Sequence, residues 1–227
     1  MDRQTAGAAF AVGLASLSPT PTLSEIPSAF VDVAQVVPDA QFDVRYFTTD
    51  NFVGARVDGY EAHRCFLTLP AAQALRAVAE EAARNALRLL IFDCYRPARA
   101  VAHFARWAAD LSDEKTKLAY YPDVEKRDLF AEGYIAEHSG HSRGSTLDLT
   151  LVNAASGRQL DMGTPFDLFG PRSWPSAPDV TPEQRANRRM LAGLMERNGF
   201  KGFDKEWWHF TLKNEPFPDT YFDFPIR

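Results

Sequence analysis

Two short segments of the sequence contain side chains that could bind a metal ion and activate water. SGHSRGSTLDLTL, residues 139–151, contains His141 and Asp148, and DKEWWHF, residues 204–210, contains Glu206 and His209. A hydrolytic zinc site needs three nitrogen, oxygen or sulfur ligands from the protein and one open position for water. His141, Asp148 and His209 would supply such a set, and Glu206 would be a base that accepts a proton from the water.

Each of these residues also has an ordinary structural interpretation. A single histidine is usually a surface or hydrogen-bonded residue, and an aspartate on a strand often fixes a turn. His138 is a rival ligand because it lies three residues before His141. The sequence has no HExxH motif. The two segments together are therefore a more specific indication of a metal site than either spacing alone.

The pattern of apolar residues predicts the elements that would position these side chains. Leu147, Leu149 and Leu151 alternate with polar residues, which is typical of a strand with one buried face, and Asp148 would point away from the leucines. We predict further strands at 42–47, 64–69, 87–92 and 207–212, and helices at 70–87, from Pro97, and at 182–198. The expected fold is a single α+β domain with helices packed around a central, mainly antiparallel sheet.

The segment EWWH presents a geometric difficulty for a shared metal site. On a regular strand, residues three positions apart point to opposite faces, so Glu206 and His209 could not reach the same ion. We therefore expect a bend, with Glu206 at the start of the strand that carries His209. Trp207 and Trp208 would fill the core or form a wall of the pocket.

Composition limits the class of protein and of partner. The chain has 227 residues, of which 45% are hydrophobic, and a formal net charge of -5, which argues against nucleic-acid binding and for a small partner. No run approaches the roughly 20 apolar residues of a membrane span, and nothing excludes a homodimer. Only two cysteines occur, Cys65 and Cys94, and we expect two free thiols rather than one bridge.

Residues 1–30 read as a leader or tail that precedes the domain at 31–227. The first four residues, MDRQ, carry one acid and one base, so they lack the positive charge of a secretory signal. We therefore expect a cytoplasmic protein. A periplasmic or secreted location is the alternative if residues 1 to about 16 act as a signal.

Three segments resemble the signature segments of the VanX-type D-alanyl-D-alanine dipeptidases, which are zinc peptidases of the M15 family. They are SGHSRGSTLDLTL, DCYRP at residues 93–97 and EWWHF at 206–210, and the resemblance extends over roughly residues 41–227. It implies one Zn²⁺ per chain, bound by His141, Asp148 and His209. It also implies that Glu206 is the catalytic carboxylate.

The resemblance implies further roles for residues outside the metal set. Arg96 matches the family's catalytic arginine, Ser139 and Asp167 match substrate-contacting residues, and Tyr46 is a weaker match. Asp167 would hold the ammonium group of the substrate, and residues 119–127 and 174–178 would close a small pocket around it. One departure is Cys94, because the family usually has glycine at that position.

The expected reaction is the hydrolysis of D-Ala-D-Ala to two D-Ala by metal-activated water. Arg96 would stabilise the oxyanion, although pairing with Asp93 to fix the turn is an alternative role. A D,D-carboxypeptidase or endopeptidase that acts on peptidoglycan stems is the alternative enzyme, and an open groove would favour it. A zinc-stabilised binding module without catalysis is the third hypothesis, against which the presence of Glu206 and Arg96 weighs.

Overall fold

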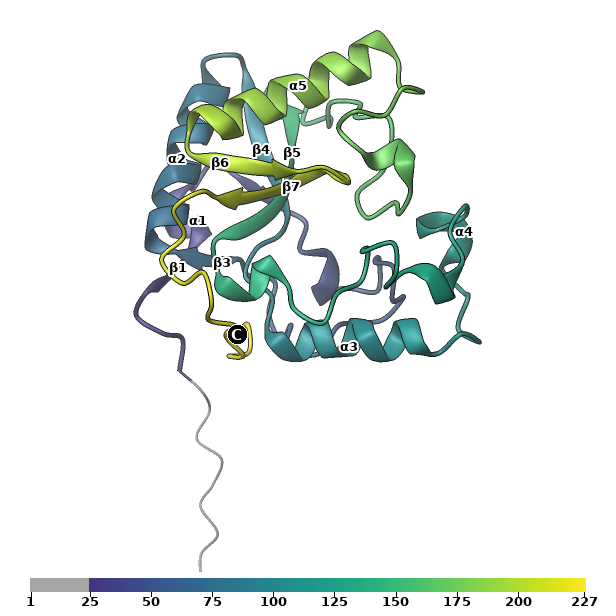
Figure 1. The fold of residues 1–227 in the computed structure, drawn as a ribbon. Helices are drawn as coiled ribbons and strands as arrows, with labels where there is room; N and C mark the ends of the chain where they lie inside the picture. The colour runs from purple at the N-terminus through teal and green to yellow at the C-terminus, as the bar shows by residue number, and fades with distance from the viewer. Residues whose placement is uncertain (1–24) are drawn as a thin grey trace, which may run out of the picture.

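A five-stranded sheet lies at the centre of the computed structural model, which describes residues 25–227 (Figure 1). Its strands, in spatial order, are β2 (Gln41–Phe42), β4 (Leu87–Asp93), β5 (Thr146–Asn153), β7 (Glu206–Leu212) and β6 (Phe200–Phe203). Only the pair of β2 and β4 is parallel, and the other neighbouring strands are antiparallel. The predicted α+β class with a mainly antiparallel sheet is therefore confirmed.

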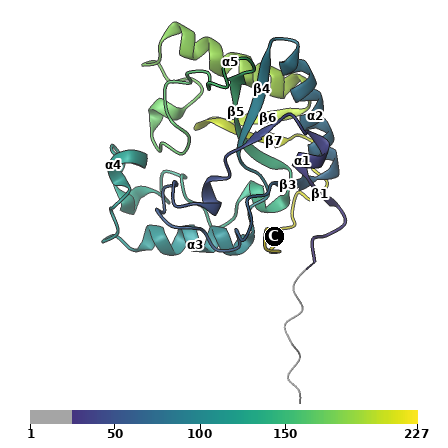
Figure 2. The ribbon, with the colours of Figure 1, turned by 180° about the vertical axis from the view of Figure 1, so that it is seen from behind.

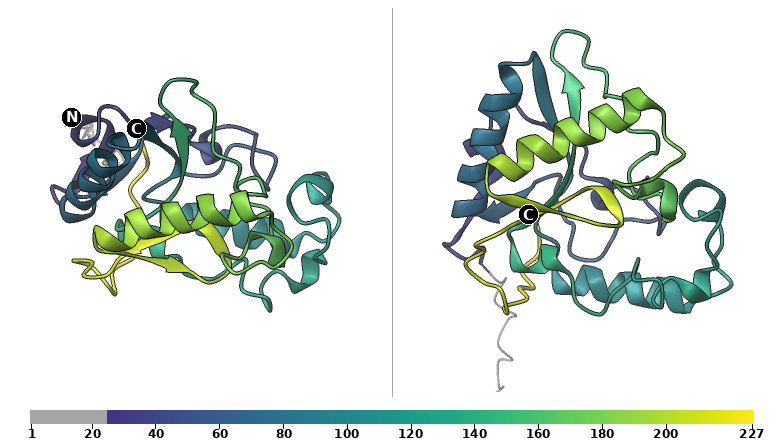
Figure 3. Two further views of the ribbon diagram at one scale, coloured as in Figure 1. Left: turned by 90° about the horizontal axis from the view of Figure 1, so that it is seen from above. Right: turned by 45° about the horizontal axis from the view of Figure 1, so that its top comes forward.

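Two helices form a layer on this sheet. Helix α2 (Leu69–Ala83) packs against β4, α5 (Pro182–Arg197) runs along β6 and β7, and the two helices also contact each other (Figure 3). A capping box of Thr181 and Gln184 starts α5, and Gly199, with a φ of +92°, follows its end. Helix α2 stops four residues before the predicted Leu87, because a turn with Ala86 at a φ of +54° leads into β4.

The remaining elements lie outside the five-stranded sheet. A small antiparallel sheet of β1 (Phe30–Asp32) and β3 (Phe66–Thr68) flanks α1 (Val33–Val36). Helix α3 (Ala98–Ala109) follows Pro97 as predicted and lies across the molecule from α5, and the short α4 (Lys117–Tyr120) lies near its far end (Figures 1 and 2). Four short 3₁₀ helices complete the described elements: Arg45–Phe47, Lys126–Asp128, Gly140–Arg143 and Pro171–Ser173.

Two predicted strands differ from the structure. The segment 42–47 is not one strand, because the chain leaves the sheet after β2 and Arg45–Phe47 forms a 3₁₀ helix that buries Tyr46. Strand β5 has two buried faces rather than one. Its polar side is covered as well, since Thr146 shares a hydrogen bond of 2.9 Å with Thr211 and Asp148 faces other buried polar residues.

The prediction of two free thiols is wrong, because Cys65 and Cys94 form a disulfide. Cys65 directly precedes β3 and Cys94 directly follows β4, and the fold brings their Cα atoms to 5.4 Å although 29 residues separate them. This distance lies in the usual range for a bridge.

The predicted leader, residues 1–30, falls mostly outside the described residues, so its boundary stays a prediction. Within residues 25–227, no helix has the length and apolar character required to cross a membrane.

Candidate active site

His141, Asp148 and His209 converge at the middle of the sheet. His141 lies on the 3₁₀ helix Gly140–Arg143, and the pairing of β5 with β7 places Asp148 directly opposite His209. His141 Nε2 is 3.2 Å from His209 Nδ1 and 3.3 Å from Asp148 Oδ2, and His209 Nδ1 is 3.1 Å from Asp148 Oδ1. The three side chains therefore present one possible ligand atom each to a common point.

The polar groups of this cluster fit a bound cation. Asp148 is buried, and within the described residues its Oδ1 has only the ring of His209 nearby, at 3.1 Å from Nδ1 and without the alignment of a regular hydrogen bond. A buried carboxylate oxygen with such poor hydrogen bonding is costly, and a metal ion would remove that cost. Two imidazole nitrogens and one carboxylate are ligands that zinc accepts. His138 is not part of the cluster, because it is exposed and stacks on Tyr221 with 4.7 Å between the ring centroids.

The two histidines of the cluster differ in their protonation. Burial lowers the pKa of His141, so its ring is neutral at pH 7. Burial also opposes the charge on His209, but the hydrogen bond and charge of Asp148, together with the charge of Glu206, raise the pKa of His209 overall. The same two histidines lower the pKa of Asp148 despite its burial. A cation bound here would therefore displace the proton of His209.

A main-chain carbonyl fixes the orientation of His141. Its Nδ1 lies 2.7 Å from the carbonyl oxygen of Cys94. A carbonyl can only accept a hydrogen bond, so Nδ1 carries the proton and Nε2 presents its lone pair toward Asp148 and His209. Such an outer hydrogen bond is the usual way in which proteins select the tautomer of a metal-binding histidine.

Glu206 is the first residue of β7, and the expected bend is present. The pairing of β6 with β7 shifts between Gly202 and Phe203, which pair with Phe210 and Glu206 respectively. Three residues of β7 are therefore left in a bulge, and Glu206 Oε2 comes to 3.5 Å from His209 Nδ1. Burial, reinforced by the charge of Asp148, raises the pKa of Glu206 to about 7.

The two tryptophans in the bulge of β7 have structural contacts. The Nε1 of Trp207 donates a hydrogen bond of 2.8 Å to Thr164, and Trp208 packs edge-to-face on Phe166. Both indoles are almost fully buried. These contacts agree with the expected core role.

Arg96 faces the cluster from the turn between β4 and α3. Its Nε and Nη2 donate to Asp93 Oδ2 at 2.9 Å each, and Nη2 lies 3.6 Å from Asp148 Oδ2. The guanidinium also lies over the ring of Tyr46, 5.0 Å from its centroid. Asp93 is held in turn by the hydroxyl of Tyr60, which donates at 2.6 Å. The alternative role predicted for Arg96, pairing with Asp93, is therefore present, and the same guanidinium still reaches the cluster.

A second buried carboxylate, that of Asp167, lies apart from the cluster. Its only hydrogen-bond donor among the described side chains is the hydroxyl of Tyr46, at 2.9 Å from Oδ2. Burial, followed by the charges of Asp148 and Glu206, raises the pKa of Asp167 well above its ordinary value. The residue has a φ of +62°, a left-handed conformation that aspartate tolerates better than most residues.

All eight predicted site residues line one cavity of about 300 Å³, which we call the site cavity. Ser139 is among them, and its Oγ accepts a hydrogen bond of 3.3 Å from the amide of His141. Sequence reasoning missed the apolar walls, because no spacing marks them: Phe52, Val101, Phe104, Ile135, Phe169 and Phe203.

The covering segments differ from the prediction. Residues 133–136 and 138–141 line the site cavity, whereas residues 119–127 do not. Pro175 and Ser176, from the other predicted segment, line a neighbouring cavity of about 420 Å³ that also reaches Glu206.

Comparison with known proteins agrees with the predicted resemblance. The family model Peptidase M15, D-Ala-D-Ala dipeptidase, matches residues 27–227. The chain is 41% identical to the D-alanyl-D-alanine dipeptidase of Enterococcus faecium over 203 residues, covering 89% of this chain and 100% of that protein. Identity to the dipeptidase of Streptomyces coelicolor is 46% over 198 residues, covering 87% of this chain and 97% of that protein. Identity to the dipeptidase of Enterococcus faecalis is 43% over 199 residues, covering 88% of this chain and 98% of that protein. The chain therefore belongs to the M15 metallopeptidase family of D-Ala-D-Ala dipeptidases.

Proposed function

We propose that this enzyme hydrolyses the free dipeptide D-Ala-D-Ala to two D-Ala, with one Zn²⁺ held by His141, Asp148 and His209. One observation carries the proposal: this three-residue cluster and the separate buried carboxylate of Asp167 line the same site cavity. The first would bind a cation beside the scissile bond, and the second would bind the ammonium group of the substrate. The names of the similar proteins agree with this substrate.

The residues around the cluster have complementary roles in this reaction. Zinc, when bound, would acidify a coordinated water and polarise the scissile carbonyl. Glu206 accepts a proton from the attacking water and returns it to the departing amine, for which a pKa near neutrality is suited. Arg96 keeps its positive charge and directs planar donors toward the oxyanion that develops on the former carbonyl.

The contact between Tyr46 and Asp167 supports selectivity for a free amine. Tyr46 is a neutral donor, so it leaves the charge of Asp167 uncompensated. An ammonium group would supply that charge, whereas an acylated amine would leave a buried carboxylate without a cation. Ser139 lines the same cavity and is the proposed contact for another polar group of the substrate.

A product assay tests the proposal against the carboxypeptidase alternative. The purified enzyme would be stripped of metal with a chelator and restored with zinc. It would then be given D-Ala-D-Ala, L-Ala-L-Ala and a pentapeptide stem that ends in D-Ala-D-Ala. We expect zinc-dependent release of D-Ala from the free D,D-dipeptide alone. Comparable release from the pentapeptide would favour the carboxypeptidase, and activity without metal would reject the zinc assignment.

The disulfide bears on where this reaction takes place. Disulfides persist mainly in oxidising compartments, so the Cys65–Cys94 bridge supports the periplasmic or secreted alternative over the cytoplasmic prediction. Alkylation of intact cells before and after reduction, followed by mass analysis, would show whether the bridge exists in the producing cell. Free thiols in that experiment would favour the cytoplasm.

A further inference from the structure

The turn that follows β4 contacts His141 and presents Arg96. It lies beyond the pairing of the five-stranded sheet, and a hydrogen bond of 2.9 Å from the amide of Tyr95 to the carbonyl of Phe66 links it to β3. The pairing of β4 with β5 becomes irregular between Ile91 and Asp93, and β4 ends at Asp93. Cys94 therefore lies just past the last regular pair of the ladder. Two residues later the chain reaches Arg96, whose amide makes only a long hydrogen bond, 3.4 Å, to the carbonyl of His141.

Cys94 connects two parts of the molecule through different atoms. Its carbonyl oxygen accepts the 2.7 Å hydrogen bond from Nδ1 of His141, and its side chain is bonded to Cys65. Cys65 is itself fixed, because its carbonyl accepts a hydrogen bond of 2.9 Å from the amide of Val33. Both cysteines are buried, with 2% of each exposed. The bridge thus ties the peptide that orients His141 to the edge of the small sheet.

We infer that the Cys65–Cys94 disulfide is a positioning element of the active site, which holds the Cys94 carbonyl against His141 and fixes the start of the turn that presents Arg96. The inference rests on the proposed role of His141 as a metal ligand. Catalytic groups must be held to within about 0.5 Å, and loss of an outer partner of a metal ligand typically costs 10- to 100-fold in metal affinity or activity.

Neighbouring groups do not provide a substitute for this carbonyl. Asp93 Oδ2 lies 3.5 Å from His141 Nδ1, but it already accepts from Arg96. The amide of the same peptide, which belongs to Tyr95, donates to the carbonyl of Phe66 next to Cys65, so without the bridge this hydrogen bond alone would tie the peptide to β3. If the peptide then rotated away, the His141 ring would have to turn toward Asp93 and compete with Arg96 for that oxygen. Loosening the bridge should therefore disturb both the proposed ligand and the proposed oxyanion donor.

The test removes the bridge at Cys65, the cysteine that does not contact His141. Cys65→Ala removes the bridge without changing residue 94. Cys65→Val/Cys94→Ala fills part of the space of the two sulfur atoms and gives the same test if the single variant does not fold. Leu75→Ala, in the buried face of α2, is the matched control, because it removes core packing from a helix that contributes no residue to the site cavity. All measurements would be made at a temperature at which each variant is fully folded by circular dichroism.

Two measurements separate positioning from simple stabilisation. Zinc affinity, measured by chelator competition, should fall by about 10- to 100-fold in the bridge variants and by less than about 3-fold in Leu75→Ala. In the metal-free protein, nitrogen-15 NMR of the His141 ring should show mainly the Nδ1–H tautomer in the parent and a mixture in the bridge variants. Folded bridge variants with parental zinc affinity and tautomer would overturn the inference.

His141→Ala separates this inference from the proposed function. If that variant kept zinc, the metal role of His141 would fail and the inference with it. If it lost zinc while the bridge variants bound zinc as the parent does, the proposed function would stand and the positioning role would be rejected.

Discussion

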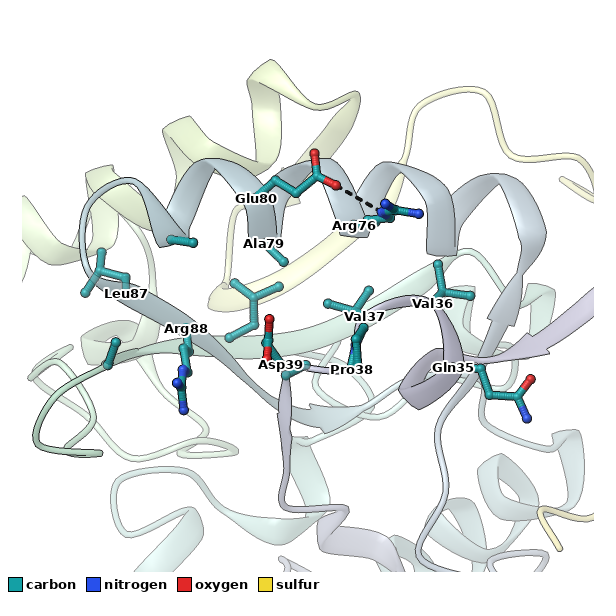
Figure 4. Close-up of a pocket in the computed structure, with 14 residues that line it drawn as sticks. Gln35, Val36, Val37, Pro38, Asp39, Arg76, Ala79, Glu80, Leu87 and Arg88 are labelled. Carbon is teal, nitrogen blue, oxygen red and sulfur yellow. Dashed lines mark hydrogen bonds and ion pairs between the residues drawn. The ribbon is translucent and has the colours of Figure 1, made fainter.

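Two cavities of this protein differ in size and in the state of their charged groups. The larger, about 560 Å³, lies between the turn after α1, helix α2 and β4, and we call it the outer cavity (Figure 4). Its charged side chains lie in solvent, and Arg76 and Glu80 pair across one helical turn at 2.9 Å with more than half of each side chain exposed. The site cavity has about 300 Å³, but Asp148 and Asp167 in it are buried and Glu206 is partly buried.

The difference shows that burial of charge, rather than volume, marks the site. Exposed charges such as Arg76 and Glu80 are screened by water and contribute little to the energy of folding. Burying Asp148 and Asp167 beside the partly buried Glu206 is costly, and folding alone gains nothing from it. Clusters of this kind persist where a ligand or a reaction uses them. Substitutions in the site cavity should therefore change activity strongly, and substitutions in the outer cavity should not.

The largest effect is expected for Glu206→Ala. Removal of a general base typically costs about 10²- to 10⁴-fold in rate, and the proposed ligands would remain in place. Turnover of D-Ala-D-Ala should fall by that amount while the zinc content, measured by mass spectrometry of the metal, stays at one per chain. Glu206→Gln keeps the shape of the side chain and should behave in the same way. Loss of zinc, or near-parental turnover, would contradict the assigned role.

Arg96→Ala should lower kcat by roughly 100-fold, because the loss of one oxyanion donor costs about that much. It also leaves the buried Asp93 without its cation, so stability should fall too. Arg96→Lys is the control, since it retains the charge beside Asp93 but lacks the planar pair of donors. A kcat in Arg96→Lys equal to that of the parent would show that charge alone suffices.

Asp167→Asn should stabilise the metal-free protein by about 1 to 2 kcal/mol at pH 7, as neutralising a costly functional group often does. Burial raises the pKa of Asp167 in the folded state, so the folded protein holds this proton more tightly than the unfolded chain. The stability due to this group is therefore present at low pH and is lost as pH rises from about 3.9 toward the raised pKa.

Urea unfolding at pH 7 and at pH 4 would test the Asp167 prediction. The advantage of the asparagine variant should shrink at the lower pH. Asparagine accepts the left-handed conformation at this position and can still accept the hydrogen bond from Tyr46. A less stable Asn variant at pH 7 would mean that Asp167 is compensated in the free enzyme.

The smallest effect is expected in the outer cavity. Ala83→Leu adds a side chain to the exposed end of α2 that lines this cavity, and leucine is a good helix former. Because surface substitutions rarely change energies by more than about 0.5 kcal/mol, kcat/KM should stay within about 2-fold of the parent. A 10-fold loss of kcat/KM would show that the outer cavity is coupled to catalysis, so that the two cavities do not differ in the way we propose.

Much of the site could be predicted because its residues lie in short, patterned segments. The alternation of leucines around Asp148 predicts a strand, and the glycine at position 199 marks the end of α5. The types and spacing of Glu206 and His209 even required the bend that the shifted pairing provides. These signals are local, so they can be recognised in the sequence without knowledge of the fold.

The remainder depends on contacts between distant segments. The bridge between Cys65 and Cys94 requires the start of β3 to lie against the turn that follows β4, which the spacing of 29 residues does not reveal. Tyr46 lies in a stretch with strand propensity, but burial of its ring beside Arg96 favours a 3₁₀ turn there. The walls of the site cavity come from segments with no common pattern. In each case tertiary packing overrides local preference.

We propose that the site cavity pairs a metal cluster with a carboxylate that binds an ammonium group. The most direct test is to measure kcat/KM for D-Ala-D-Ala and for N-acetyl-D-Ala-D-Ala, in the parent and in Asp167→Asn, and to compare the two ratios. Sites built around a polar partner reject analogues that lack it by up to about 10⁴- to 10⁵-fold. We expect a parental preference of at least about 100-fold for the free dipeptide, most of which is lost in the Asn variant. Comparable parental values for the two substrates would contradict it and favour a D,D-carboxypeptidase.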